Sequence, residues 1–524
     1  MNAALHRLAR WGAALDFAQL PDAVVEAAKT QLLSTLASVH AGYRSDLGQP
    51  IRNAFGLEGS GAHAIPAGIS TAPAQAAFLM AAWGIVLDFD DIMLGGHTGH
   101  STALVPLAYA QRKQSSGRDL LLAQIVANEI TARVNLTVAL GPVRGQMASH
   151  VHLLGAAAAR AKLENLDAGQ FAESLGFALS QPPRALYPGF LGSDAKALCA
   201  AWPVRMGLES VDAVKAGLRG NAAILDAPRG FIATFAPMPV RECLDGLGER
   251  WHTTTNSIKP YPACGYLNAV LDATLSLVRN HDIDADTVAS VEVHASLFTL
   301  GMDAHSAPYL DGAQSRISTL TFSTPYTVAC AILHRDLSPD HLPRDRIADG
   351  RVWDLAKRVR VVHDMDHTIA ALLADIPIGA AIKRARGKGA LRLLLGIGGA
   401  RLAGKLLLQN PLGFVRLLRA LRKAAGSEDA PDFSRSTKAL GATVKLRTTR
   451  GESFEESVAI PRGFAGSGGA ESLRKIAREK YCRQAAGLIG DEKAAQAADL
   501  LERLEELGPD EVMQLVQLNC AVTQ

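Results

Sequence analysis

Three carboxylates lie within four residues of the chain, at Asp88, Asp90 and Asp91. They follow an apolar stretch typical of a helix, and negative charge at the C-terminal end of a helix opposes the helix dipole. Such a cluster needs compensation by a metal ion or by nearby cations, and paired carboxylates are also natural general bases. The plain alternative is a solvated helix end without a function. The cluster is therefore a first candidate for a reactive site.

Two histidines follow in a glycine-rich loop. His97 and His100 lie three residues apart in the segment 95–101, where glycines let the backbone turn sharply or approach a ligand. Neutral imidazoles there could move protons near neutral pH, or bind a metal ion together with Asp88. A metal site is the less specific interpretation, because there is no HExxH motif and no third histidine at ligand spacing.

Two lysines lie in segments that could aim them at a ligand. Lys259 is followed by Pro260 and Pro262, and prolines hold the backbone around them extended. That rigidity is useful if the ammonium group must point in one direction. Lys196 lies in the segment Gly-Ser-Asp-Ala-Lys-Ala before an apolar helix. Because a single lysine is usually just solvated, neither decides the function by itself.

The elements that must position these residues change character at Lys259. Before it, apolar residues recur at three and four residues, as in helices, and after it alternating runs typical of strands appear. Helices return near the C-terminus. We expect helices that begin near Pro21 and Thr71 and over Leu104–Arg112, Asp119–Leu140, His152–Leu163, Asp167–Leu179, Ala195–Gly217, Leu267–Val278, Phe322–Leu333, Glu471–Tyr481 and Glu492–Leu507, with strands at Val288–Ala295, within Val352–Asp364, and as a hairpin over Ala442–Ile460.

This pattern predicts a mainly α fold with an α+β lid. The 524 residues exceed the size at which one hydrophobic core stops growing, so two domains are expected. We expect a helical body formed by both chain ends, residues 1–258 and 466–524, and a lid at residues 259–465.

The bulk composition favours a folded cytoplasmic protein. A net charge of +3 is too small to indicate nucleic acid as a partner. The six cysteines are scattered without a CxxC pair, so neither a zinc ribbon nor a disulfide framework is expected. The N-terminal segment lacks a continuous apolar run before Asp16, so we do not predict a signal peptide. The apolar stretch 71–87 ends in carboxylates and is better explained as a buried helix than as a membrane span.

One segment, at about 375–440, is an unusual basic and leucine-rich insertion. Between Asp375 and Glu428 it has no acidic residue and many lysines and arginines. A basic amphipathic helix there, over residues 375–428, could lie on an anionic membrane or bind an acidic partner. We favour the alternative, an ordinary helical insertion whose leucines pack on the lid and whose basic groups face water.

The ordered set of motifs resembles the MmgE/PrpD family. The landmarks occur in family order and span Pro21 to about Arg478. They are VVEAAKTQLLSTLASVHAGY at 24–43, LDFDD at 87–91, the histidine loop leading to Val105-Pro106, GAAAARAKL at 155–163, GSDAKAL at 192–198, IKPYPACGY at 258–266, FSTPYTVACAIL at 322–333 and the closing strands with AIPRG at 459–463. The basic insertion has no counterpart in this set.

The resemblance implies a two-domain fold, a homodimer, and an active site between body and lid. The family's activities include 2-methylcitrate dehydration, cis-aconitate decarboxylation and epimerisation of a dicarboxylate, none of which needs a metal ion or an organic cofactor. Carried over position by position, its catalytic residues correspond to Asp88, to His97 or His100, to Lys196 and to Lys259. Aimed ammonium groups would bind a polycarboxylate substrate and stabilise developing negative charge.

The chain departs from the common family pattern near this site. Where many members have a histidine, Ile85, Gln146 and Asn268 stand here. Gln146 can hydrogen-bond a carboxylate but cannot transfer a proton as imidazole does.

We assign substrate binding to Gln146, to His150 and, within the FSTPYTVACAIL motif, to Tyr326. His150 or His152 could replace the missing histidine. The histidine loop is also one residue longer, and the position of His-Ser-Thr before Val105-Pro106 favours His100 over His97 as the proton-transfer group.

The residues and the resemblance together predict a cofactor-independent lyase. It would be a dehydratase or a decarboxylase acting on a small di- or tricarboxylic acid of the methylcitrate or aconitate type. An isomerase or epimerase of a dicarboxylate is the alternative, and a non-catalytic family member is a third possibility. Retention of Asp88, Lys196 and Lys259 weighs against the third. The departures from the common pattern argue for a subfamily with a substrate of its own.

Overall fold

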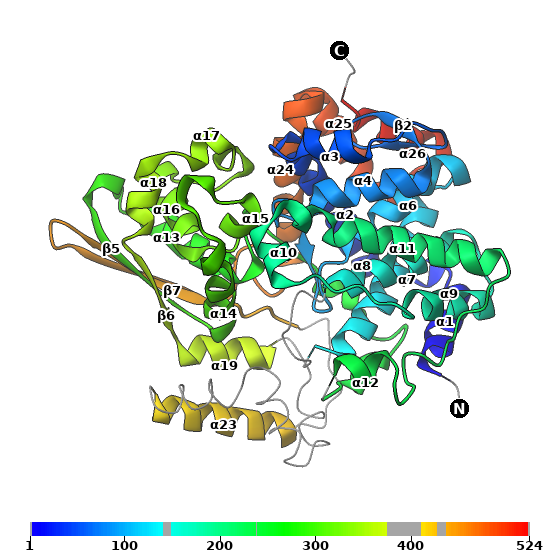
Figure 1. The fold of residues 1–524 in the computed structure, drawn as a ribbon, viewed down its shortest axis with the longest axis horizontal. Helices are drawn as coiled ribbons and strands as arrows, with labels where there is room; N and C mark the ends of the chain where they lie inside the picture. Colours follow the sequence, from blue (N-terminus) through cyan, green and yellow to red (C-terminus); the bar gives the residue numbers. More distant parts are fainter. Residues whose placement is uncertain (1–2, 140–147, 237, 375–409, 427–435, 522–524) are drawn as a thin grey trace.

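The computed structural model describes residues 3–139, 148–236, 238–374, 410–426 and 436–521. Figure 1 shows helices gathered in one half and a small sheet with its own helices in the other. The helices are α1 Ala4–Ala14, α2 Asp22–Arg44, α3 Gly48–Phe55, α4 Pro73–Ile85, α5 Gly99–Thr102, α6 Leu104–Lys113, α7 Gly117–Thr137, α8 Ala148–Leu163, α9 Ala168–Ala178, α10 Tyr187–Gly192, α11 Leu198–Lys215, α12 Phe231–Phe235, α13 Asn268–Asn280, α14 Leu297–Ser306, α15 Ile317–Leu320, α16 Thr324–His334, α17 Arg344–Ile347, α18 Gly350–Ala356, α19 Met365–Ala374, α23 Pro411–Gly426, α24 Ala470–Ile489, α25 Asp491–Glu502 and α26 Pro509–Leu518. The strands are β1 Ala62–Ala64, β2 Ile69–Thr71, β3 Asp91–Ile92, β4 Ser257–Ile258, β5 Val288–Ala295, β6 Val359–His363, β7 Ala442–Thr448 and β8 Ser453–Val458.

Both chain ends contribute to the helical body. The C-terminal helix α24 packs along α2, α26 packs on α6, and α1 packs on α9. Helix α4 is apolar on all sides, as expected of a helix at the centre of a bundle, and it lies between α2, α6 and α11. The expected mainly α fold with a helical body formed by both chain ends is confirmed. The domain limits at 258/259 and 465/466 stay predictions.

The lid is built on a four-stranded sheet of order β6-β5-β7-β8. Strands β5 and β6 are parallel, whereas β5–β7 and the β7–β8 hairpin are antiparallel. Buried residues alternate along β7, because α13 packs on one face of the sheet while the other face meets solvent. The expected strand at Val288–Ala295 and the hairpin over Ala442–Ile460 therefore form as the alternation predicted.

The basic insertion is described only in part. Residues 375–409 and 427–435 lie outside the described residues, and between them α23 packs on α19. Arg416 of α23 forms an ion pair with Asp366. Three apolar residues of α23 are exposed, Leu412 by 79%, Val415 by 40% and Leu418 by 50%. The expectation that the leucines of this segment pack on the lid is thus wrong for Leu412 and Leu418.

Within the described part of the chain, no helix combines the length and the apolar character that crossing a membrane requires.

Candidate active site

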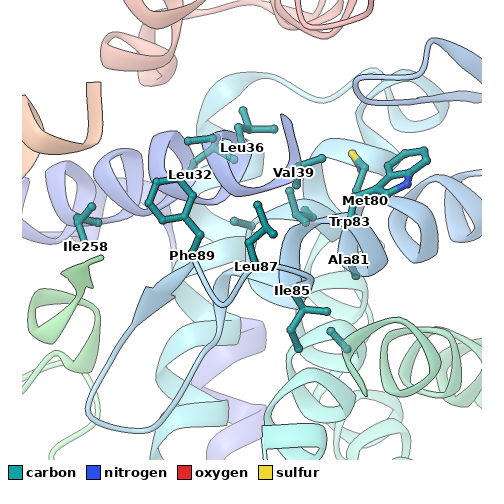
Figure 2. Close-up of a cluster of buried hydrophobic side chains, with 14 of the residues drawn as sticks. Leu32, Leu36, Val39, Met80, Ala81, Trp83, Ile85, Leu87, Phe89 and Ile258 are labelled. Atoms are coloured by element: carbon teal, nitrogen blue, oxygen red, sulfur yellow. The ribbon is translucent and has the colours of Figure 1, made fainter. Parts of the chain in front are cut away.

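The acidic turn after α4 is divided between two environments. Leu87 and Phe89 are buried against α2, next to Leu32 and Leu36, as Figure 2 shows. The intervening aspartates take part in a different set of contacts, with lysines and histidines. Burial of the two apolar side chains therefore fixes the turn, and Asp88 adopts a left-handed backbone conformation with φ of 51°.

A short strand pairing brings Lys259 to this turn from far along the chain. Strand β3 follows the turn directly, and it pairs antiparallel with β4, with Asp91 opposite Ile258. Because Lys259 is the next residue after β4, the pairing places it beside the aspartates 171 positions earlier.

Two buried ammonium groups converge on Asp88. Lys259 Nζ donates hydrogen bonds to Asp88 Oδ2 at 2.9 Å, to the Asp88 carbonyl at 2.9 Å and to Asp90 Oδ1 at 3.0 Å. Lys196, on the 3-10 turn Asp194–Ala197, places its Nζ 3.0 Å from Asp88 Oδ1. The Lys196 ammonium also lies 4.8 Å from the ring centre of Phe322. Each oxygen of the Asp88 carboxylate therefore has its own lysine.

The lysines determine the ionisation of the carboxylates. Burial alone would raise the pKa of Asp88, but Lys196 and Lys259 outweigh it and lower that pKa to about 2. Burial is likewise outweighed at Asp90, whose pKa is held well below its ordinary value by His97 and Lys259. Burial would lower the pKa of Lys259, but the two aspartates raise it. Both carboxylates are therefore ionised at neutral pH.

Both loop histidines contact the same oxygen of Asp90. His97 Nδ1 lies 2.6 Å from Asp90 Oδ2 and 3.0 Å from the Asp91 carbonyl. His100 Nε2 lies 3.3 Å from Asp90 Oδ2. The two acceptors at Nδ1 assign the proton of neutral His97 to that nitrogen, which leaves Nε2 as its basic nitrogen. His97 exposes 22% of its side chain, whereas His100 is fully buried.

The third aspartate holds the histidine loop in place. Asp91 accepts hydrogen bonds from Gln31 Nε2 at 2.8 Å and from Thr35 Oγ1 at 3.2 Å, and Gln31 also donates to Thr98 Oγ1. A side chain at Gly99 would meet Asp91 Oδ1 at 2.1 Å, so the loop passes too close to the carboxylate for any other residue. Asp91 thus fixes the loop, and Asp90 orients its histidines.

The structure brings Asp88, Lys196, Lys259, His97 and His100 together, but not all of the residues assigned to substrate binding. Gln146 lies outside the described residues.

The other two assigned residues lie among different neighbours. The His150 ring packs on Phe231 and Phe235, at 5.1 and 4.6 Å between ring centres, and burial lowers its pKa to about 4. Tyr326 is buried in the lid, with its ring 5.3 Å from that of Trp353. Their contacts give no support to the substrate-binding roles that we assigned.

His152, the other candidate replacement histidine, does adjoin the cluster. Its ring centre lies 5.3 Å from that of His100, and burial together with His100 holds its pKa well below the ordinary value. His150 and His152 do not share one face, because both lie on helix α8, where side chains two residues apart point in different directions.

Two features of the site were not predicted from the sequence. Asp90, rather than Asp88, bonds the histidines, and Lys480 of α24 reaches the acidic turn from the C-terminal end of the chain. A signal for Lys480 existed, because it shares a helical stripe with the apolar residues Ile476, Ala477 and Tyr481. A lysine on the buried face of a helix is unusual and indicates a partner inside the core.

Within the described ranges, no three or more His, Cys, Asp or Glu side chains are grouped so that they could hold a metal ion.

Comparison with known proteins adds two findings. Residues 6–242 match the MmgE/PrpD N-terminal domain, and residues 261–383 match the MmgE/PrpD C-terminal domain. Two curated proteins named cis-aconitate decarboxylase, both from Aspergillus terreus, are distantly similar. The first is 24% identical over 380 residues, covering 68% of this chain and 77% of the relative, and the second is 24% identical over 379 residues, covering 67% and 76%.

Proposed function

The chain belongs to the MmgE/PrpD family, and from that membership we propose that it is a cofactor-independent lyase acting on a small di- or tricarboxylic acid. The reaction would be a dehydration or a decarboxylation. The distant similarity to proteins named cis-aconitate decarboxylase supports a lyase role in general. The departures near the site, such as Asn268, favour a substrate of this subfamily's own.

The observation that carries the proposal is the pair of ammonium groups on Asp88. Lys196 and Lys259 lie 3.0 and 2.9 Å from its two oxygens, and both side chains are buried. A carboxylate of the substrate would share this positive charge, because charge-assisted hydrogen bonds in a water-poor site are strong and directional.

We assign Asp88 the role of aiming the lysines rather than that of a base. A group with a pKa of about 2 is a weak proton acceptor near neutral pH. Its carboxylate instead holds both Nζ atoms at fixed positions before the substrate arrives, which is the preorganisation that electrostatic catalysis needs.

We propose His97 as the proton-transfer group. Its Nδ1 is held by Asp90 at 2.6 Å, its Nε2 is the basic nitrogen, and it is the more exposed of the two loop histidines. Sequence considerations favoured His100, but that imidazole is fully buried, between Gly84 and His152. We therefore assign His100 the role of supporting Asp90.

These roles suffice for both lyase reactions. In a dehydration, His97 removes a proton from the carbon next to a carboxylate, the C–H electron pair forms the double bond, and the C–O bond on the adjacent carbon breaks. The departing hydroxyl takes the proton that His97 now carries and leaves as water, which returns His97 to its neutral form. In a decarboxylation, the bond to a carboxylate breaks, CO2 departs, and protonated His97 delivers its proton to the carbon. In both, the developing negative charge lies next to carboxylates bound by lysines.

A panel of di- and tricarboxylic acids incubated with the protein in D2O tests the proposal. Formation of a double bond or release of CO2 is expected for at least one acid. Deuterium incorporation without net conversion would show the alternative, an epimerase or isomerase of a dicarboxylate. No change in any acid would show a family member without this catalytic activity.

A further inference from the structure

We propose that Lys480 is a positioning residue of the candidate active site, whose ammonium group clamps the peptide between Asp88 and Asp90. The inference rests on the proposed function in one respect, because it takes the acidic turn to be catalytic. Lys480 lies on α24, outside residues 6–242 and 261–383 that match the two MmgE/PrpD domains.

The contacts of Lys480 meet at a single point of the turn. Its Nζ donates to the carbonyl of Phe89 and to Ser34 Oγ, the latter at 2.9 Å. The ammonium also lies 4.0 Å from the centre of the Phe89 ring. Ser38 Oγ of α2 donates to the same carbonyl at 2.8 Å. The Phe89 carbonyl is thus held from two helices that come from opposite ends of the chain.

Phe89 links Asp88 to Asp90. The orientation of its two peptide groups therefore sets the directions in which the two aspartate side chains point. Asp88, which binds both catalytic lysines, precedes it, and Asp90, which orients His97, follows it. Asp88 is also held at a φ of 51°, a conformation that costs energy in a residue other than glycine. Fixing the carbonyl between the two aspartates therefore fixes the lysine pair relative to the histidine.

A lysine is a costly residue to use here for packing alone. It exposes only 6% of its surface, and its hydrogen bonds go to neutral oxygens. Burial lowers the pKa of Lys480 to about 7, Asp90 and Asp91 oppose that shift, and Lys259 adds to it. A methionine of similar length would fill the same space without this desolvation cost. The functional contact with the turn explains the choice of lysine.

The test compares K480M with K475M, a control on the exposed side of the same helix. For K480M we expect the turnover number to fall about tenfold to a hundredfold, with a much smaller change in KM, because Lys196 and Lys259 remain. Its thermal midpoint should not lie below that of K475M. Unchanged turnover in K480M would overturn the inference, and so would a drop in thermal midpoint that accounts for the lost activity.

A second measurement separates this inference from the proposed function. If the wild-type protein converts no polycarboxylate, the proposed function fails, and crystal structures of the wild-type protein and K480M still test the clamp. We expect the Phe89–Asp90 peptide of K480M to rotate and the contact between Asp90 and His97 to lengthen. An unchanged turn in that structure would overturn the inference whatever the activity.

Discussion

At the residue scale, the site is a set of buried charges that match one another. Asp88 and Asp90 carry the negative charges, and Lys196 and Lys259 contact them. Breaking a buried pair is costly because the remaining charge stays unpaired. These four ions therefore depend on one another, and substituting Asp88, Asp90, Lys196 or Lys259 should act on both stability and activity.

The assignment of the histidines predicts unequal effects of replacing them. H97N should lower the turnover number by at least a hundredfold, because it removes the basic nitrogen. H100N should lower it less, because His100 acts through Asp90 at 3.3 Å. Steady-state kinetics on the substrate found in the panel checks this. If H100N lost all turnover while H97N kept it, His100 would be the proton-transfer group, as the sequence favoured.

The buried carboxylates predict loss of stability in acid. The pKa values of Asp88 and Asp90 are lower in the folded chain than the roughly 3.9 of an unfolded aspartate. Their ion pairs therefore stabilise the fold above about pH 4 and lose that effect as the pH falls towards 2.

Urea unfolding at pH 7, 5 and 3.5 measures this loss. D90N should be less stable than the wild-type protein at pH 7, and the difference should shrink at pH 3.5. The exposed control E479Q should follow the wild-type curve. A D90N deficit that stayed constant over this range would show that ionisation of Asp90 does not stabilise the fold.

A site residue could be predicted from the sequence when the residues next to it in the chain already mark it. Asp88 could be predicted because three carboxylates lie within four residues, and Lys196 and Lys259 because small-residue or proline-fixed segments surround them. The structure brings all three together. The choice between His97 and His100 depends on side-chain exposure, which a motif does not encode. Lys480 depends on the packing of α24 against α2, a contact between residues some 446 positions apart.

At the scale of elements, the strand pairing that brings Lys259 to the aspartates is too short to show a periodic pattern in the sequence. The β3–β4 pairing has two residues in each strand, so no alternation reveals it. The longer elements were predictable because their periods are long enough to count, as at β5 and α2. The alternation of apolar and acidic residues in Leu87–Asp90 is also visible in the sequence. Its role becomes clear only in the fold, where Leu87 and Phe89 pack against α2.

The exposed side of α23 permits one test of the basic insertion. Its two interpretations, an ordinary insertion or a surface for anionic membranes, predict different behaviour with lipid vesicles. We expect the protein to stay in the supernatant with vesicles containing anionic lipid, because α23 is docked on α19 and Arg416 is paired with Asp366.

Co-sedimentation at low salt that is lost in a variant with Leu412, Val415 and Leu418 changed to serine would instead establish membrane contact. Binding that persisted in this variant would place the contact elsewhere on the chain.

At the scale of the whole molecule, the site draws residues from distant parts of the chain. Asp88 and Lys196 come from the first half, Lys259 from the start of the proposed lid, and Lys480 from the C-terminal return. Such an arrangement forms only when the body is complete. The homodimer, the cytoplasmic location and the absence of a nucleic-acid partner stay predictions.

The lysine pair also leads to a prediction about metal ions. The positive charge that a polycarboxylate needs comes from Lys196 and Lys259, so turnover should survive EDTA followed by gel filtration. The measurement is the turnover number before and after chelation. Activity that vanished and returned with one added metal ion would assign a metal-binding role to Asp90 and the loop histidines.

The most direct test of the central claim is the turnover of the best polycarboxylate substrate by K196M and K475M, followed by proton NMR in D2O. Loss of one charge-assisted contact to the developing negative charge, worth about 1.5–3 kcal/mol, should lower kcat/KM roughly tenfold to a hundredfold in K196M. The control K475M should match the wild-type protein. Full activity of K196M on that substrate would contradict the claim that the lysine pair on Asp88 is the catalytic centre.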